Sequence, residues 1–507
     1  MTRTRNPWHV LLVLCLGQSV ALMDTTIVNV AIPAIVEGTG ATVNQVLWVL
    51  NGYVLTYAVL IVTGGRLGDL FGQKRAFMAG LGLFITASAL CGLAADPVQL
   101  IAARLLQGVG GAVLTPQALA IVSHIFPPER RGAALGVWGA FVSAAAAIGP
   151  TVGGLLVSSL GWRWVFFVNL PIGLAAIALS AVVVPDLRGA GRRRLDVRGT
   201  VVLMAALAAL VYALLEGARH SWGRLWGPVT APALVVAGLV LLVVFFLVER
   251  SRQDRDPLVP FAVLRDREFT VMSLVVAALP SGLGAMLLLT SINLQFGRGL
   301  SAAATGLALA VAPLVSVLVS PFGGRLTDRF GGKYVLIVGF GLFAGGIGAL
   351  ALAARPDVAW TASVPGLALA GVGMGVVFSP PATIAMRGIP PALSGAASGL
   401  FNMTRLGGSL LGAAAVGAVL QSRLAASFAE VEGLPGDVGT AVRRSVAGAE
   451  GVDLAAVRDL GGPSWDTVFQ HAVLDAVRWT YLLPVTIVVA GALGALAVRA
   501  RAPDAVR

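Results

Sequence analysis

The sequence of 507 residues contains very few charged residues for its length. Asp, Glu, Lys and Arg together make up 12% of the chain, whereas a typical soluble domain has about 25%. Apolar residues supply 57% of the chain, and the mean hydropathy is +0.87. So few charges cannot cover the surface of a soluble protein of this size. The composition therefore predicts a polytopic membrane protein.

Cysteine and histidine, which build disulfide frameworks and many metal sites, are also scarce. The two cysteines, Cys15 and Cys91, each lie within an apolar run, and the four histidines show no metal-ligand spacing. The nucleotide-binding motif G-x-x-x-x-G-K-[ST] is absent, and no segment is large enough for a soluble nucleotide-binding domain. We therefore expect no disulfide, no metal and no cofactor. The absence of the nucleotide-binding motif also excludes energy from nucleotide hydrolysis, so any energy-driven activity of the chain has to draw on an ion gradient.

Long apolar runs fill most of the chain, separated by Gly, Pro and charged residues. They have close to the ~20 residues that a helix needs to cross a bilayer, and they lack the period-two alternation of barrel strands. The fourteen runs cover residues 8–33, 45–64, 76–95, 98–123, 132–158, 164–184, 199–217, 229–248, 269–293, 303–323, 334–354, 361–386, 395–420 and 472–498. The sequence thus predicts an all-α membrane protein with 14 transmembrane helices and both termini on the same side.

The basic residues, which give a net charge of +12, concentrate in alternate loops. This distribution is typical of cytoplasmic loops, and it predicts that both termini are cytoplasmic. It also favours the lipid bilayer over nucleic acid as the partner of the positive charge. The first run is longer than a signal-peptide core and contains Asp24 and Asn29. We therefore expect it to be a retained first helix.

One loop motif occurs twice. Residues 65–75 read Gly-Arg-Leu-Gly-Asp-Leu-Phe-Gly-Gln-Lys-Arg, and residues 324–333 read Gly-Arg-Leu-Thr-Asp-Arg-Phe-Gly-Gly-Lys. This repeat indicates two duplicated six-helix bundles with two further helices between them. The predicted parts are an N-terminal bundle at 1–184, two inserted helices at 185–250, a C-terminal bundle at 251–498 with a long outer loop at 421–471, and a cytoplasmic tail at 499–507.

Two ionisable residues stand out within the apolar runs. Asp24 lies in the first run, where a carboxylate costs roughly 2.5 to 3.5 kcal/mol on insertion scales, so we expect it to face a cavity or a partner. Capping or snorkelling is the alternative. Arg104 lies a few residues into the fourth run. It either snorkels to the outer face or points into the bundle and tunes the acidity of Asp24, and together the two are our candidates for proton coupling.

The repeated motif suggests a gate between helices. Its candidate residues are Gly65, Asp69, Gly72, Lys74, Arg75 and Asp328. The glycines permit a tight turn, while Asp69 can cap a helix or pair with Lys74 or Arg75. Such a charge latch would hold two helices together in one state of a transport cycle. The alternative is that the basic residues only set the topology.

Two further sets of residues complete the candidate sites. In the fifth predicted helix, Gly149 and Pro150 interrupt the hydrogen-bond ladder, and Gly153 and Gly154 allow another helix to approach closely. Polar and aromatic side chains in the spans are candidates for substrate binding, although we expect most of them to be packing residues. They are Asn29, Trp48, Asn51, Tyr53, Tyr57, Gln117, Asn293 and Asn402.

Taken together, these motifs resemble those of the fourteen-span drug:proton antiporters of the major facilitator superfamily. The resemblance is carried by Leu22–Pro33, Gly65–Arg75 and its copy, Arg104–Gly111, Gly149–Gly154, Trp162–Pro171 and Asn402–Ser409. It implies the major facilitator fold and a monomer with no enzyme activity. It also implies proton-coupled export of small amphipathic compounds, such as drugs or antibiotics, across the bacterial cytoplasmic membrane by alternating access.

Two other functions stay open at this point. An exporter of a metabolite, a peptide or a siderophore could have the same fold and the same motifs. A membrane scaffold or sensor that transports nothing is the second alternative. The buried carboxylate of Asp24 argues against the scaffold, which would not need it.

Overall fold

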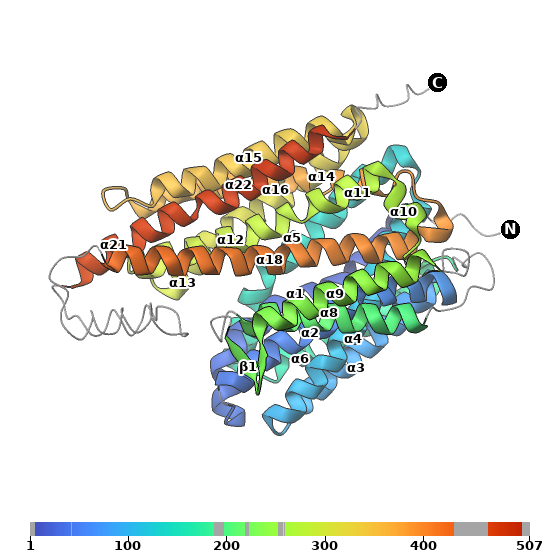
Figure 1. Cartoon of the computed structure of the whole chain (residues 1–507), viewed down its shortest axis with the longest axis horizontal. Helices are drawn as coiled ribbons and strands as arrows, with labels where there is room; N and C mark the ends of the chain where they lie inside the picture. The colour runs from blue at the N-terminus through green and yellow to red at the C-terminus, as the bar shows by residue number, and fades with distance from the viewer. Residues whose placement is uncertain are drawn as a thin grey trace.

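The computed structural model describes residues 6–41, 43–186, 197–217, 223–251, 257, 259–429 and 465–498. Nearly all of these residues are helical, and the helices run side by side along the long axis of the molecule (Figure 1). Within the described ranges, the strands form one short antiparallel hairpin, β1 (Arg224–Trp226) and β2 (Val229–Thr230). The prediction of an all-α membrane fold is confirmed.

The first half of the chain makes six helical passes. They are α1 (Pro7–Thr39), α2 (Val43–Phe71), α3 (Gln73–Leu93), α4 (Pro97–Ile125), α5 (Pro128–Leu160) and a broken sixth pass made of α6 (Trp164–Phe167) and α7 (Asn169–Val183). Local signals set several of these ends. Asp96 accepts a hydrogen bond from the backbone N–H of Gln99 and so caps α4. Gly72, with φ of +94°, makes the turn between α2 and α3.

The two inserted helices, α8 (Val197–Gly217) and α9 (Ala231–Arg250), pack on each other, and α8 packs on α2. The β-hairpin lies between them in the sequence and leads directly into α9. Tyr212 of α8 lies between Trp226 of the hairpin and Trp48 of α2, with ring centroids 5.3 Å and 5.8 Å away. The insert is therefore attached to the first half through α2.

The second half repeats the packing of the first. Its elements are α10 (Phe261–Arg265), α11 (Arg267–Val276), α12 (Ala278–Ile292), η1 (Asn293–Gly297), α13 (Ala302–Leu309), α14 (Val311–Phe330), α15 (Gly332–Ala353), η2 (Trp360–Ala362), α16 (Ser363–Val377), α17 (Pro380–Ala385), η3 (Pro391–Leu393), α18 (Ser394–Ala429), α21 (Asp466–Thr480) and α22 (Leu482–Leu496). Here α14 packs on α16 as α2 packs on α4, and α12 packs on α18 as α1 packs on α5. This correspondence supports a duplicated architecture, while the predicted domain boundaries stay predictions.

Twelve helices among the described residues are long and apolar enough to cross a membrane. The predicted spans in α5 and α8 are not among these twelve, so the count of 14 stays a prediction. The long outer loop predicted at 421–471 needs a correction, because α18 continues to Ala429 and α21 already begins at Asp466. Residues 430–464 and the predicted tail at 499–507 lie outside the described residues.

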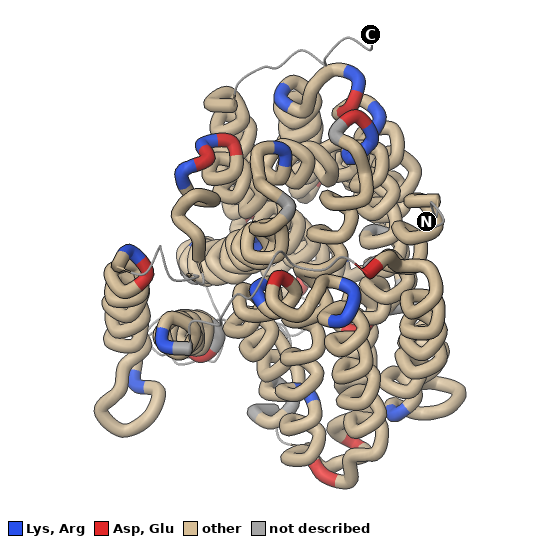
Figure 2. Tube along the Cα trace, turned by 90° about the vertical axis from the view of Figure 1, so that its right-hand side faces the viewer, with Lys and Arg blue, Asp and Glu red and all other residues tan. Residues whose placement is uncertain are grey.

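Several connections meet at one end of the bundle, which we call the motif end because both copies of the loop motif lie there. The ring of Trp8, at the start of α1, packs 5.2 Å from Phe126 at the end of α4. Lys333, at the start of α15, bonds to the carbonyl of Leu496 at the end of α22. Figure 2 looks onto this end and shows Lys and Arg on helix ends and connections, while most helix bodies carry no charge.

Candidate proton-coupling site

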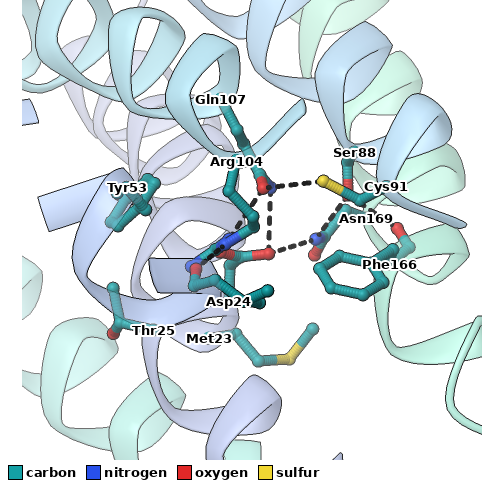
Figure 3. Close-up of polar contacts among 12 residues, drawn as sticks. Met23, Asp24, Thr25, Tyr53, Ser88, Cys91, Arg104, Gln107, Phe166 and Asn169 are labelled. Atoms are coloured by element: carbon teal, nitrogen blue, oxygen red, sulfur yellow. Dashed lines mark hydrogen bonds and ion pairs between the residues drawn. The ribbon is translucent and has the colours of Figure 1, made fainter. Parts of the chain in front are cut away.

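Asp24 lies buried inside the first half, where α1 faces α3, α4 and α7 (Figure 3). Its side chain is 0% exposed, and that of Arg104, on α4, is 2% exposed. Arg104 points into the bundle, and its Nη1 donates to Asp24 Oδ2 at 2.5 Å. The inward orientation is therefore the observed one, and the snorkelling alternative is wrong for this state.

Two neutral amides complete the surroundings of the Asp24 carboxylate. Gln107 Nε2 and Asn169 Nδ2 both donate to Asp24 Oδ1, at 2.9 Å and 3.1 Å. The sequence reasoning assigned neither residue to the site. Gln107 follows Arg104 by three positions, which places both on one face of a helix, so its presence could have been anticipated. Asn169 lies far away in the sequence, and no spacing pointed to it.

The orientation of Arg104 is itself fixed by several contacts. Its Nε donates to the backbone carbonyl of Val49 at 2.9 Å, and its Nη1 also donates to Gln107 Oε1 at 2.7 Å. The guanidinium lies 4.7 Å from the ring centroid of Tyr53. A buried ion pair is tolerated only where such additional bonds satisfy the remaining donors. The site is thus built to hold a charged pair away from water.

Each of these contacts to the Asp24 carboxylate is a donated hydrogen bond. Arg104 donates to one oxygen, and the two amides donate to the other. This arrangement suits the ionised carboxylate, because an ionised carboxylate only accepts hydrogen bonds. In chemical terms the site can hold and release one proton without covalent chemistry. Among the described residues, no group of three or more His, Cys, Asp or Glu side chains is arranged to bind a metal ion.

Close packing of α5 on α1 flanks this site. A Cβ atom at Gly149 would overlap Thr26 Oγ1, and one at Gly153 would overlap the side chain of Ile27. These two glycines therefore allow the close approach that the sequence predicted. Gly154 does not contribute to it, because a Cβ there would meet only an ordinary contact at 3.9 Å. The helix α5 continues through Pro150, whose side chain lies outside the described residues.

The loop-motif aspartates make contacts between the two halves. Asp69, at the end of α2, accepts hydrogen bonds from the backbone N–H groups of Gly395 and Ala396 in the first turn of α18, both at 2.9 Å. Asp328, at the end of α14, accepts from Gly132 and Ala133 of α5, at 2.8 Å and 2.7 Å. Anions are favoured near helix N-termini, where N–H groups and the helix dipole meet them. The two contacts hold the halves together at the motif end.

The predicted pairing of Asp69 with Lys74 or Arg75 is not what the structure shows. Lys74 Nζ donates to the carbonyl of Ala181 near the end of α7 at 2.7 Å, and Arg75 lies 3.8 Å from Asp186. The reason is that the chain turns at Gly72, so both basic residues belong to α3 and face α7. The carboxylate of Asp69 stays on α2 and faces α18.

The predicted role of Gly65 in a turn is also corrected. Gly65 lies inside α2, and a Cβ atom there would overlap the backbone of Gly395. Its counterpart Gly324, inside α14, lies equally close to the backbone of Gly132 on α5. Both residues therefore serve close helix crossing between the halves. The turn itself is made by Gly72.

The substrate candidates whose side chains the structure describes do not form one cluster. Tyr53 belongs to the Asp24 site and stacks on Tyr57, with ring centroids 5.8 Å apart. Trp48 instead contacts the inserted helix α8 through Tyr212. Asn51 is partly buried on α2, and the side chain of Asn29 lies outside the described residues.

The remaining amide candidates are engaged in packing contacts or deeply buried. Gln117 Nε2 donates to the carbonyl of Gly64 on α2 at 2.8 Å, which ties α4 to α2. Asn402 Nδ2 donates to the carbonyl of Ser398, one turn earlier in α18, at 3.0 Å. Asn293 is 1% exposed in η1. Substrate binding by these residues stays a prediction.

Comparison with known proteins identifies relatives over most of the chain. The profile of the Major Facilitator Superfamily matches residues 14–413. An uncharacterized MFS-type transporter of Mycobacterium tuberculosis is 37% identical over 438 residues, which are 86% of this chain and 74% of that protein. A puromycin resistance protein of Streptomyces alboniger is 36% identical over 429 residues, which are 83% and 84% of the two chains.

A solved structure gives the same fold at low sequence identity. The structure of a proton:xylose symporter of the superfamily covers 96% of this chain and 94% of its own, with a TM-score of 0.60 and 12% identity. At this identity the likeness concerns the fold alone.

Proposed function

Because the chain belongs to the major facilitator superfamily, we propose that it is a proton-coupled antiporter that exports amphipathic organic compounds across the bacterial cytoplasmic membrane. The observation that carries this proposal is the buried pair of Asp24 and Arg104. An intramembrane carboxylate is costly, and it marks ion pathways and proton relays. The chain has no nucleotide-binding motif that could supply energy in another way.

The exported compounds belong to the drug and antibiotic class in this proposal. A puromycin resistance protein is among the relatives that share about a third of their residues with this chain over most of its length. Each copy of the chain carries both halves of the transporter, so we propose that a monomer is the functional unit. We further propose that the motif end, with its basic connections, lies in the cytoplasm.

The contacts at the motif end suggest how transport proceeds. In this state Asp69 and Asp328 hold that end closed, because each binds the N-terminal part of a helix from the other half. We propose that in this state the substrate path is open towards the opposite, outer side. A proton from outside then neutralises Asp24, which weakens its bond to Arg104 and releases the substrate. Rocking of the two halves returns the site to the cytoplasm, where the proton leaves.

Transport in proteoliposomes with an imposed pH gradient tests this function. Puromycin and a panel of other amphipathic antibiotics should accumulate only while the gradient lasts, and a protonophore should abolish accumulation. Asp24→Asn protein, inserted to the same level, should show no gradient-driven transport. Transport that persists after collapse of the gradient, or in the Asn variant, would contradict the proposal. Activity confined to peptides, siderophores or metabolites would assign the chain to another export class.

A further inference from the structure

The side chain of Asn169 holds an unusual position in the Asp24 site. It is 0% exposed, and its Nδ2 donates both to Asp24 Oδ1 at 3.1 Å and to Ser88 Oγ at 3.0 Å. Its carbonyl oxygen Oδ1, however, accepts no hydrogen bond from the described residues. Buried amide oxygens are nearly always paired, so an unpaired one needs an explanation.

The protonation of Asp24 supplies that explanation. A protonated carboxyl group carries an O–H donor and needs an acceptor. Arg104 has only donors and cannot serve. Gln107 cannot turn its amide, because its Oε1 is held by Arg104 Nη1 at 2.7 Å and by Cys91 Sγ at 3.6 Å. Among the side chains bonded to Asp24, Asn169 alone has an oxygen that is not committed elsewhere.

We propose that the amide of Asn169 rotates when Asp24 is protonated. While Asp24 is ionised, the NH₂ group of Asn169 donates to the carboxylate. When Asp24 is protonated, the carbonyl oxygen of Asn169 accepts from the carboxylic acid. The inference rests on the proposed function, in which Asp24 carries the coupling proton. Rotation by half a turn about the last side-chain bond exchanges the two ends of the amide. Oδ1 then lies where Nδ2 lay, within reach of both Asp24 and Ser88. Asn169 keeps two hydrogen bonds in either state.

Ser88 links rotation of the Asn169 amide to the sixth pass. In the ionised state, its hydroxyl donates to the backbone carbonyl of Phe166 at 2.9 Å. After the amide turns, the hydroxyl donates to Asn169 Oδ1, since a hydroxyl rotates freely to suit its partner. The Phe166 carbonyl then loses the bond that Ser88 donates in the ionised state. Protonation thus loosens the hold of α3 on the break between α6 and α7.

The other titratable or charged side chains that face Asp24, within the described part of the chain, are Arg104 on α4, Tyr53 on α2 and Cys91 on α3. The parts of α5 that pack on α1 at this level present Gly149 and Gly153, which carry no charge. The hydrogen bonds to Asp24 in this part of the chain come from Arg104, Gln107 and Asn169, and neither Tyr53 nor Cys91 is bonded to it. The proposed response therefore belongs to this one amide.

Infrared difference spectroscopy of the purified full-length protein tests the proposal without any substrate. Spectra would be recorded as a function of pH on protein containing asparagine labelled with ¹³C at the amide carbonyl. The carboxyl band that disappears in Asp24→Asn reports protonation of Asp24. As this band appears, the labelled amide band should move to lower frequency, because Oδ1 goes from no donor to two. The shift should be absent in Asn169→Leu, which assigns it among the seven asparagines of the chain.

Two further variants keep the test decisive if Asn169→Leu folds poorly. Ser88→Ala removes one of the two donors, so the amide shift should persist and be roughly halved. Gln18→Leu is the matched control: Gln18 is another buried amide on α1, but it donates to Thr115 Oγ1 at 3.3 Å. That variant should keep the carboxyl band and the full amide shift.

The outcomes separate this inference from the proposed function. A carboxyl band that titrates normally while the labelled amide does not respond would overturn the role of Asn169 and leave the antiporter proposal intact. If no band is lost in Asp24→Asn at any pH, the proton site itself is wrong, and the antiporter proposal fails with it. An unchanged shift of the labelled amide band in Ser88→Ala would show that Ser88 does not donate to Asn169 Oδ1 when Asp24 is protonated.

Discussion

Replacing Asp24 by Asn tests the buried ion pair most directly, because it removes the charge with little change of shape. Arg104 would keep its bonds to the carbonyl of Val49 and to Gln107 Oε1, and it would keep the Tyr53 ring. It would lose the anionic partner that compensates its charge. Removing one partner of a buried pair costs about 3 to 5 kcal/mol, since the other charge stays uncompensated. We expect Asp24→Asn to lower the stability of the folded bundle by about this amount.

The reverse single change should behave in the same way. Arg104→Leu leaves the Asp24 carboxylate with two neutral donors, Gln107 and Asn169, and we expect a similar loss of about 3 to 5 kcal/mol. The double variant carries neither charge. Its loss should therefore be much smaller than the sum of the two single losses, because residues in contact are not additive.

Thermal unfolding in detergent, followed by intrinsic tryptophan fluorescence, would give the stabilities, and proteoliposomes would give transport. We expect Asp24→Asn, Arg104→Leu and the double variant all to lose gradient-driven transport, while Asp24→Glu keeps part of it. The double variant should therefore recover much of the stability that the single variants lose, but it should not recover transport. Additive losses of stability would refute the energetic coupling of the pair. Undiminished pH-driven transport by Asp24→Asn would remove Asp24 from the mechanism.

Three further predictions concern the orientation, the gate and the substrate. Tags at residues 2 and 507 should be inaccessible from outside intact cells, whereas a cysteine replacing Gly436 should be labelled; external labelling of either terminus would contradict the orientation. Asp69→Asn should speed labelling of Ser398→Cys from the cytoplasmic side by about 5- to 150-fold, because a lost charge-assisted bond costs about 1 to 3 kcal/mol. An unchanged rate would show that the contact does not hold the end closed. Monocationic amphiphiles should be transported better than matched dications, because a second buried charge would lack its own carboxylate at the Asp24 site; equal transport of the dication would reveal a further acidic group on the path.

The chemistry of the site was visible in the sequence only where a residue contrasts with its surroundings. Asp24 stands out because a carboxylate interrupts an apolar run, and the structure places it at the centre of the polar contacts. The direction of Arg104 could not be predicted, since it depends on how α4 is rotated against α1. Asn169 lies in the Trp162–Pro171 segment that resembles the family, but nothing in that segment indicated a role for its side chain. A neutral amide is inconspicuous in a membrane helix, and it meets Asp24 across 145 positions of sequence.

Of the two roles predicted for Asp69, the structure shows the helix cap and not the pairing with Lys74 or Arg75. Closeness in sequence favoured Lys74 and Arg75 as partners of Asp69, whereas its bonds reach Gly395, 326 positions away. A turn at one glycine separates the faces of α2 and α3, and sequence spacing cannot show which face meets the other half. The repeat did predict that Asp328 would act like Asp69. Both aspartates bind backbone N–H groups across the interface between the halves.

The two halves share their helix packing and their contacts at the motif end, but within the described residues a buried ion pair occurs only in the first half. The second half has a neutral contact at the corresponding place, because Thr290 Oγ1 of α12 bonds to Oη of Tyr481, the residue between α21 and α22, at 2.8 Å. A proton bound in the first half must therefore act on the interface through helix packing. The helix α5 is suited to this, because Gly149 lies against α1 near Asp24 and Gly132 of the same helix binds Asp328. A shift of α1 on protonation of Asp24 would thus act directly on the helix that Asp328 holds at the motif end.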